Sequence, residues 1–191
     1  AYVGLWGGSF VLDELPVEGI NSSLSASEMT TGTPFRLAAN LGKSFQGSVV
    51  LGMGFTLTPK QADELIEINK SNQDVIFPYI NGEDLNSQCD QSPTRQVINF
   101  FDWPLGSDTA TPSNSGAAAS NYPDCLRIVR DKVKPDRDRN KRKNYRERWW
   151  QFAERCPGLY SAIAELKRVL IIAQVSRTVA FVFVPNGWVY S

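Results

Sequence analysis

One segment of this sequence is rich in arginine and lysine, and these residues could bind an anionic partner. The chain of 191 residues carries 20 basic and 20 acidic side chains, yet twelve Lys and Arg against five Asp and Glu fall between Arg127 and Arg155. Such a segment attracts the phosphates of a nucleic acid, and an aromatic ring can stack among the cations. The alternative is a solvated helix whose charges offset the acidic remainder of the chain. The candidate phosphate contacts are Lys132, Lys134, Arg137, Arg139, Arg142, Lys143, Arg146 and Trp150, with Lys141 and Arg148 broadening the patch.

The spacing within this segment predicts one long helix from about Arg137 to Arg155. At about 100° per residue, aromatic residues share one stripe of that helix and cations share a second stripe. The first stripe is Tyr145, Trp149, Phe152 and Cys156, and the second is Arg139, Lys143, Arg146 and Trp150. We therefore expect Trp149 in the core and Trp150 at the surface that contacts a nucleic acid.

Several catalytic chemistries are excluded by composition. Histidine is absent, which removes Ser-His-Asp and Cys-His catalysis, His-dependent metal sites and nucleases with a His base. The cysteines Cys89, Cys125 and Cys156 lack zinc-site spacing and indicate reduced thiols in a cytoplasmic protein. The loop with Gly52 and Gly54 lacks the acidic residue of a nucleotide or S-adenosylmethionine site, so close backbone packing or a bend is favoured. We predict no catalytic residue, no metal site and no cofactor in this chain.

Two pairs of carboxylates receive structural interpretations. Asp136 and Asp138 lie at a predicted helix start, where acids cap the helix and interact favourably with its dipole. Glu83 and Asp84 follow the turn signal Asn81-Gly82, and capping or solvent exposure is the expected role.

The predicted elements give an α+β (mixed α/β) fold of short strands, about four helices and a late buried hairpin. Strands are expected at 48–55, 95–103, 169–175 and 179–184, and helices at 58–69, 123–133, 137–155 and 157–167. Only residues 176–178 separate the last two strands, which predicts a tight hairpin at the centre of a sheet. The Ser, Thr and Ala-rich tract at 104–121 predicts a mobile surface loop. No apolar run reaches the length of about eighteen residues that a membrane span needs.

A series of sequence blocks carries a resemblance to a known family. The blocks are LAANLGKSFQGSVVLGMGFTLTPKQADELI, PYINGEDLN, QSPTRQVINFFDWPL, YPDCLRIVRDKVKPDRDRNKRKNYRERWWQFAERCPGLYSAI and RVLIIAQVS. In this order they resemble the target recognition domain of MmeI-like type IIL restriction-modification enzymes, over residues 37–191. Residues 1–36 resemble the lead-in from the preceding methyltransferase domain. The tract 109–120 departs from the family, in which a shorter link is expected.

The resemblance also implies where bases are read. In the family, specificity-setting residues follow the Val-Ser that ends the first late strand, which here is Val175-Ser176. Ser176, Arg177 and Thr178 are therefore the base-reading candidates. An arginine at a hairpin tip can reach guanine through two parallel hydrogen bonds, and the alternative for Arg177 is a solvent-exposed turn residue. Secondary candidates for DNA contact are Lys43, Asn81 and Arg95.

The resemblance implies a module that reads double-stranded DNA for other domains. Such enzymes are single chains that combine an endonuclease, an adenine-N6 DNA methyltransferase and one recognition domain. The methyltransferase and nuclease domains of the same parent chain are then partners, and S-adenosylmethionine and a divalent cation belong to that parent. The chain opens without Met, and we expect an excised cytoplasmic domain that contacts no membrane. The alternatives are a catalytic S-adenosylmethionine-dependent methyltransferase fragment and a protein-interaction domain with a basic helix.

Overall fold

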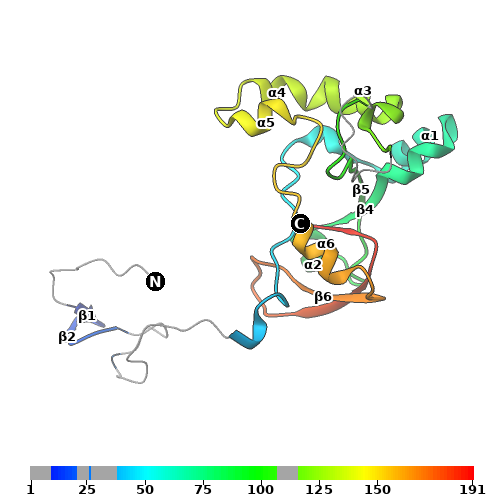
Figure 1. Ribbon diagram of the computed structural model, residues 1–191. Helices are drawn as coiled ribbons and strands as arrows, with labels where there is room; N and C mark the ends of the chain where they lie inside the picture. Colours follow the sequence, from blue (N-terminus) through cyan, green and yellow to red (C-terminus); the bar gives the residue numbers. More distant parts are fainter. Residues whose placement is uncertain (1–9, 21–25, 27–37, 107–115) are drawn as a thin grey trace. The chain divides into compact units, whose positions relative to one another are not determined.

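The chain folds as two units, residues 1–41 and 42–191 (Figure 1). The computed structural model describes residues 10–20, 26, 38–106 and 116–191. In the first unit, β1 (Phe10–Leu12) and β2 (Leu15–Val17) form an antiparallel hairpin, and the 3-10 helix η1 (Ala38–Asn40) follows. The lead-in segment 1–36 stays a prediction, because residues 27–37, where it would end, lie outside the described part.

A four-stranded sheet organises the second unit. Its strands are β3 (Thr56–Leu57), β5 (Arg95–Ile98), β4 (Ile76–Ile80) and β8 (Val189–Tyr190), in that spatial order. Only the β4–β8 pair is parallel within this sheet. β5 ends earlier than predicted because the Asn99 side chain accepts a hydrogen bond from the Phe101 amide at 2.9 Å, which turns the chain. Phe101 adopts a left-handed backbone there, with φ of 51°.

Helices cover this sheet and close the main core. α1 (Pro59–Ile68) begins where predicted, with a capping box between Thr58 and Gln61 and Pro59 in the first turn. The 3-10 helix η3 (Lys70–Val75) leads into β4, η5 (Ala119–Asn121) precedes α3, and α3 (Pro123–Lys132) matches the helix expected from Pro123. The core residues of this cluster include Phe55, Val97, Cys125, Val129 and Phe152.

The strand predicted at residues 48–55 does not form. Val49 makes an isolated bridge with Glu154, and the 3-10 helix η2 (Met53–Phe55) follows. Leu51 and Gly52 have φ of 45° and 143°, which are incompatible with a continuous strand. A Cβ on Gly54 would lie 2.4 Å from the Cβ of Lys132. The close-packing interpretation of this glycine is confirmed.

A second, smaller core lies around α2 (Gly82–Ser87), α6 (Pro157–Ile163) and a two-stranded sheet of β6 (Arg168–Ile172) and β7 (Phe181–Pro185) (Figure 1). The antiparallel strands place Leu170 opposite Phe183. Ile80, Leu159, Ile163, Val184 and Tyr190 are its buried residues.

The late strands are not central in a sheet as expected, and their hairpin is not tight. They form a sheet of their own, and residues 173–180 connect them. One face, with Val169, Ile171, Val182 and Val184, packs on the smaller core. The opposite face leaves Leu170, Ile172, Phe181 and Phe183 exposed.

The α+β fold class is confirmed by these mixed small sheets and helices. The loop predicted at 104–121 falls partly outside the described residues, at 107–115, while Ala118 and Ala119 are fully buried. α6 ends at Ile163, earlier than the predicted 167. In the described ranges, no helix is both long and apolar enough to cross a membrane.

Candidate nucleic-acid interface

The basic segment is broken into short helices instead of forming one long helix. α4 (Lys134–Asp138) and α5 (Lys143–Glu147) follow α3, and residues 148–156 contain no regular helix. The Asn140 side chain accepts a hydrogen bond from the Arg142 amide at 2.9 Å, a local bond that competes with helix formation. Arg146 holds this turn by donating to the carbonyls of Asn140 and Lys141 at 2.7 and 3.0 Å. The prediction of a helix over 137–155 is wrong, and the two-stripe arrangement fails with it.

The adjacent tryptophans Trp149 and Trp150 both pack in the main core, Trp149 inside it and Trp150 at its edge. Trp149 is 6% exposed, so its predicted core position is confirmed. Trp150 is half-buried, and its indole N–H donates to the Trp103 carbonyl at 3.0 Å. The Trp149 and Trp150 rings meet edge to face, with centroids 5.9 Å apart. Trp150 therefore packs against the core rather than standing among exposed cations, because the chain leaves the helical path at Arg148.

Four of the predicted phosphate contacts lie along α3, α4 and α5. Lys132, Arg139 and Lys143 are exposed, and Lys134 is half-buried. The side chains of Lys132 and Arg139 have no hydrogen-bond or ion-pair partner in the part of the chain that is described. Lys134 and Lys143 each pair with the acid four residues later, at 2.7 and 3.5 Å. Such exposed pairs contribute about 0.3–0.5 kcal/mol in helices, so these lysines are readily available to another anion.

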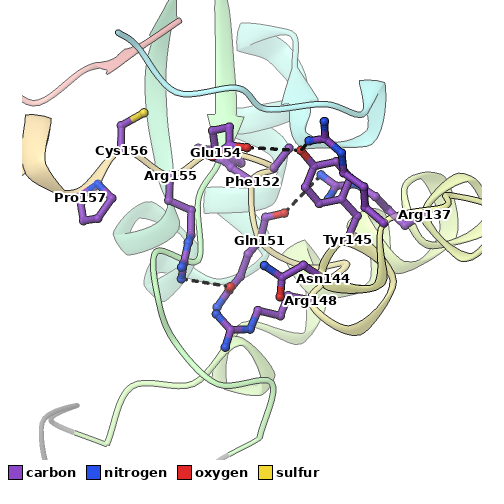
Figure 2. A pocket seen from close by; sticks show the side chains of 12 residues that line it. Arg137, Asn144, Tyr145, Arg148, Gln151, Phe152, Glu154, Arg155, Cys156 and Pro157 are labelled. Carbon is purple, nitrogen blue, oxygen red and sulfur yellow. Dashed lines mark hydrogen bonds between the residues drawn. The ribbon is translucent and has the colours of Figure 1, made fainter. Parts of the chain in front are cut away.

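Other arginines gather around an open groove between α5 and the returning chain at 151–157 (Figure 2). Its volume is about 390 Å³. Arg137, Arg142, Arg148 and Arg155 line it, together with one carboxylate, Glu154. The groove concentrates positive charge in a concave surface, where a low-dielectric wall focuses the field.

Arg137 lies in this groove wall and not on an exposed stripe. Its side chain is 3% exposed, and burial lowers the pKa of its guanidinium from the usual value, partly offset by Tyr145. The guanidinium lies near two aromatic rings, 5.2 Å from the Tyr145 centroid and 5.9 Å from that of Phe55. Its Nη2 donates to three backbone carbonyls, those of Val50, Leu51 and Gln151, at 3.1, 2.8 and 3.3 Å. Arg137 thus ties the α4 segment to the irregular segment before η2.

The predicted base-reading residues lie in the connection between β6 and β7. Ser176, Arg177 and Thr178 are all exposed. The Ser176 hydroxyl hydrogen-bonds to Asn86 Oδ1 at 2.8 Å, and the Asn86 amide donates to the Val175 carbonyl at 3.2 Å. α2 therefore holds one side of this loop. The Arg177 side chain has no partner within the described ranges, and its base-reading role stays a prediction.

The secondary DNA-contact candidates have structural partners in two of three cases. Asn81 is the N-cap of α2, in a capping box with Asp84, so its side-chain oxygen is already engaged. Asp84 is 1% exposed, which confirms the capping interpretation of that acid. Arg95 forms an ion pair with Glu83. Lys43 is exposed at the start of the second unit.

Three groove residues were missed by sequence reasoning. Asn144, Gln151 and Arg155 line the groove, and Arg155 pairs with Asp102. Helical spacing gave no signal for them, because the turn after α5 brings residues 151–157 back against the helix.

Titratable groups elsewhere do not assemble into a metal site among the described residues. No group of three or more His, Cys, Asp or Glu side chains there could hold a metal ion. Cys89, Cys125 and Cys156 are free thiols, as predicted.

The fold is similar to part of a solved enzyme. The type IIL restriction-modification enzyme MmeI, whose structure was determined in complex with DNA, matches 93% of this chain with a TM-score of 0.56 and 14% sequence identity. The chain spans 22% of the MmeI chain. At this identity the likeness shows a shared fold. No protein-family model and no curated protein matches the sequence.

Proposed function

We propose that this chain is the DNA target recognition domain of a type II restriction-modification enzyme. The observation that carries the proposal is the fold shared with MmeI over nearly the whole chain. The sequence blocks at residues 37–191 resemble the recognition domain of the same family, which is an independent line of support.

The surface chemistry suits a duplex partner. The exposed cations Lys132 and Arg139 carry no internal partner in the described ranges, and the arginine-lined groove lies beside the same short helices. Contacts from Arg and Lys to phosphates supply most of the non-specific affinity of DNA-binding proteins. Base contacts supply the specificity, and the exposed loop 173–180 offers Ser176, Arg177 and Thr178 for that purpose.

The remaining activities belong, in this proposal, to a longer parent chain. The parent is an adenine-N6 DNA methyltransferase with endonuclease activity in the cytoplasm, and it uses S-adenosylmethionine and a divalent cation. The residues described here do not fit either group. They contain no candidate metal cluster, and the space beside Gly54 that a cofactor loop would need is filled by Lys132 and Val133. In this proposal the chain directs methylation and cleavage, and other domains of the parent perform them.

Duplex binding as a function of salt tests the proposal. Fluorescence anisotropy with labelled duplexes should give an affinity that falls linearly with salt on a log–log plot, by about 0.9 per phosphate contacted. The variant Lys132→Gln/Arg139→Gln should flatten that slope by about 1.8 at most. Lys60→Gln is the matched control, since Lys60 is exposed on α1 and pairs with Glu64. Absence of duplex binding at low salt, or binding without salt dependence, would contradict the proposal.

Methylome sequencing of cells that carry the parent enzyme tests specificity. Exchange of residues 173–180 between two such parents should exchange part of the methylated site. An unchanged site after the exchange would remove the loop from base reading.

A further inference from the structure

In the described part of the chain, three of the four groove arginines lack a carboxylate partner. Arg155 pairs with Asp102. Arg142 donates to the neutral phenol of Tyr145 at 2.7 Å and stacks on its ring, with 5.2 Å to the centroid. Arg148 is exposed, and its side chain makes no hydrogen bond or ion pair with any described residue. No ion pair among the described residues therefore neutralises the charges of Arg137, Arg142 and Arg148.

Arg137 adds a buried charge whose hydrogen bonding is incomplete. All three hydrogen bonds of the Arg137 side chain come from Nη2, and the buried Nε has no acceptor within the described ranges. Its acceptors are backbone carbonyls, which carry no formal charge. A buried cation without a counter-ion is costly, and an anion close by would stabilise it through a medium of low dielectric.

Neutral donors and an open side complete the site. Asn144 and Gln151 line the groove between the arginines, and the Gln151 amide donates to the Trp103 carbonyl at 2.9 Å. The one lining acid, Glu154, is exposed and accepts from the Tyr145 hydroxyl at 3.4 Å. Guanidinium groups match the oxygens of a phosphate in pairs of parallel hydrogen bonds.

We propose that the groove lined by Arg137, Arg142 and Arg148 is a binding site for a single phosphate group. Under the proposed function, on which this assignment of the source rests, the phosphate is one phosphodiester of the duplex backbone. Arg142 and Arg148 contact its oxygens, and Arg137 supplies positive potential from behind them. The site anchors the duplex at one point, apart from the cations spread along α3 and α4.

Thermal unfolding of the 191-residue chain in inorganic phosphate tests the site directly. A ligand that binds only the folded state raises the unfolding temperature as its concentration increases. Phosphate also stabilises proteins generally because it is excluded from their surface. Specific binding is therefore judged from the difference between variants at equal ionic strength. Arg148→Gln should bind phosphate at least threefold more weakly than wild type. Its unfolding temperature in chloride should be unchanged, since its side chain has no partner. Arg130→Gln is the matched control, because Arg130 is exposed on α3 and does not line the groove.

A duplex-binding series separates this inference from the proposed function. Arg148→Gln and Arg142→Gln should each lower the log–log salt slope by up to about 0.9, because both arginines contact the same phosphate. An identical phosphate response in Arg148→Gln, Arg130→Gln and wild type would overturn the site, even if all three bind duplex DNA. A phosphate response lost only in Arg148→Gln would support the site even if the wild type binds no duplex, and then the proposed function fails instead. A lost phosphate response with an unchanged salt slope would overturn the duplex backbone as the source.

Discussion

Replacement of Arg137 by Met should destabilise the fold strongly, whereas the same change at Arg139 should not. Both arginines belong to the same short basic segment. Arg137 is 3% exposed and holds three carbonyls, whereas Arg139 is exposed and has no partner in the described ranges. Methionine is of comparable length and apolar, so it keeps part of the packing against the aromatic rings.

The magnitude follows from the hydrogen bonds that are lost. A hydrogen bond from a charged donor contributes about 1.5–3 kcal/mol. One nitrogen with two hydrogens serves three carbonyls, so at least one of these bonds is shared. Leu51 is an exposed residue, so water can rehydrate its carbonyl. We therefore expect a loss of about 3 kcal/mol for Arg137→Met, which corresponds to about two such bonds at the lower value. Arg139→Met should change stability by less than about 0.5 kcal/mol.

Urea denaturation followed by tryptophan fluorescence measures both variants. A loss of about 3 kcal/mol is a large part of the ~5–15 kcal/mol that stabilises a typical domain. The Arg137 midpoint should fall while the slope m stays unchanged. Equal, small losses at the two positions would refute the view that Arg137 is a structural tie between α4 and the segment before η2.

Three further predictions concern other elements. Trp149→Ala should destabilise by about 3–5 kcal/mol through the cavity it leaves, whereas Trp150→Phe should cost about 1 kcal/mol through the lost indole hydrogen bond; equal losses in urea denaturation would contradict the assigned burial. Burial, with a smaller effect of a neighbouring acid, raises the pKa of Cys125 to about 12, so alkylation at pH 8 followed by mass spectrometry should label exposed Cys89 and spare Cys125 until the protein unfolds. Arg177→Ala in the parent enzyme should relax one position of the methylated site, with a discrimination loss of about 1–3 kcal/mol at that base pair; an unchanged site with uniformly reduced methylation would place Arg177 on the backbone.

Capping residues and prolines in the sequence correctly predicted where several helices begin, because nearby residues determine these positions. The capping box of Thr58 and Gln61 set the start of α1, and Pro123 set the start of α3. The cap formed by Asn81 and Asp84 was foreseen only as one role for the acids after a turn. In each case the stabilising bonds join residues at most four positions apart, which is the range that a sequence pattern reports.

Elements fixed by distant contacts could not be predicted in the same way. Asn86 holds Ser176 across 90 positions of the chain, so the connection 173–180 is longer than the turn that local spacing indicated. Arg137 bonds to Val50 across 87 positions, and no helical periodicity reports such a bond. The helix break at Asn140 has a local cause, an Asx turn, but a prediction from helical spacing alone does not detect such a turn.

The groove and the loop 173–180 should contribute independently to DNA binding. The groove arginines lie beside the main core with Phe55 and Phe152, whereas the loop joins strands that pack on the smaller core with Val184. Phosphate contacts position a protein on a duplex, and base contacts specify the sequence. Effects of residues that share no partner normally add within about 0.5 kcal/mol. In the parent enzyme, the double variant Arg148→Gln/Arg177→Ala should therefore lose the sum of the two single losses in duplex-binding free energy, measured on the cognate site at one salt concentration. On a non-cognate duplex only the Arg148 loss should persist. A coupling well above 0.5 kcal/mol would show that anchoring and base reading share one structural element, and the separation into two cores would then carry no functional meaning.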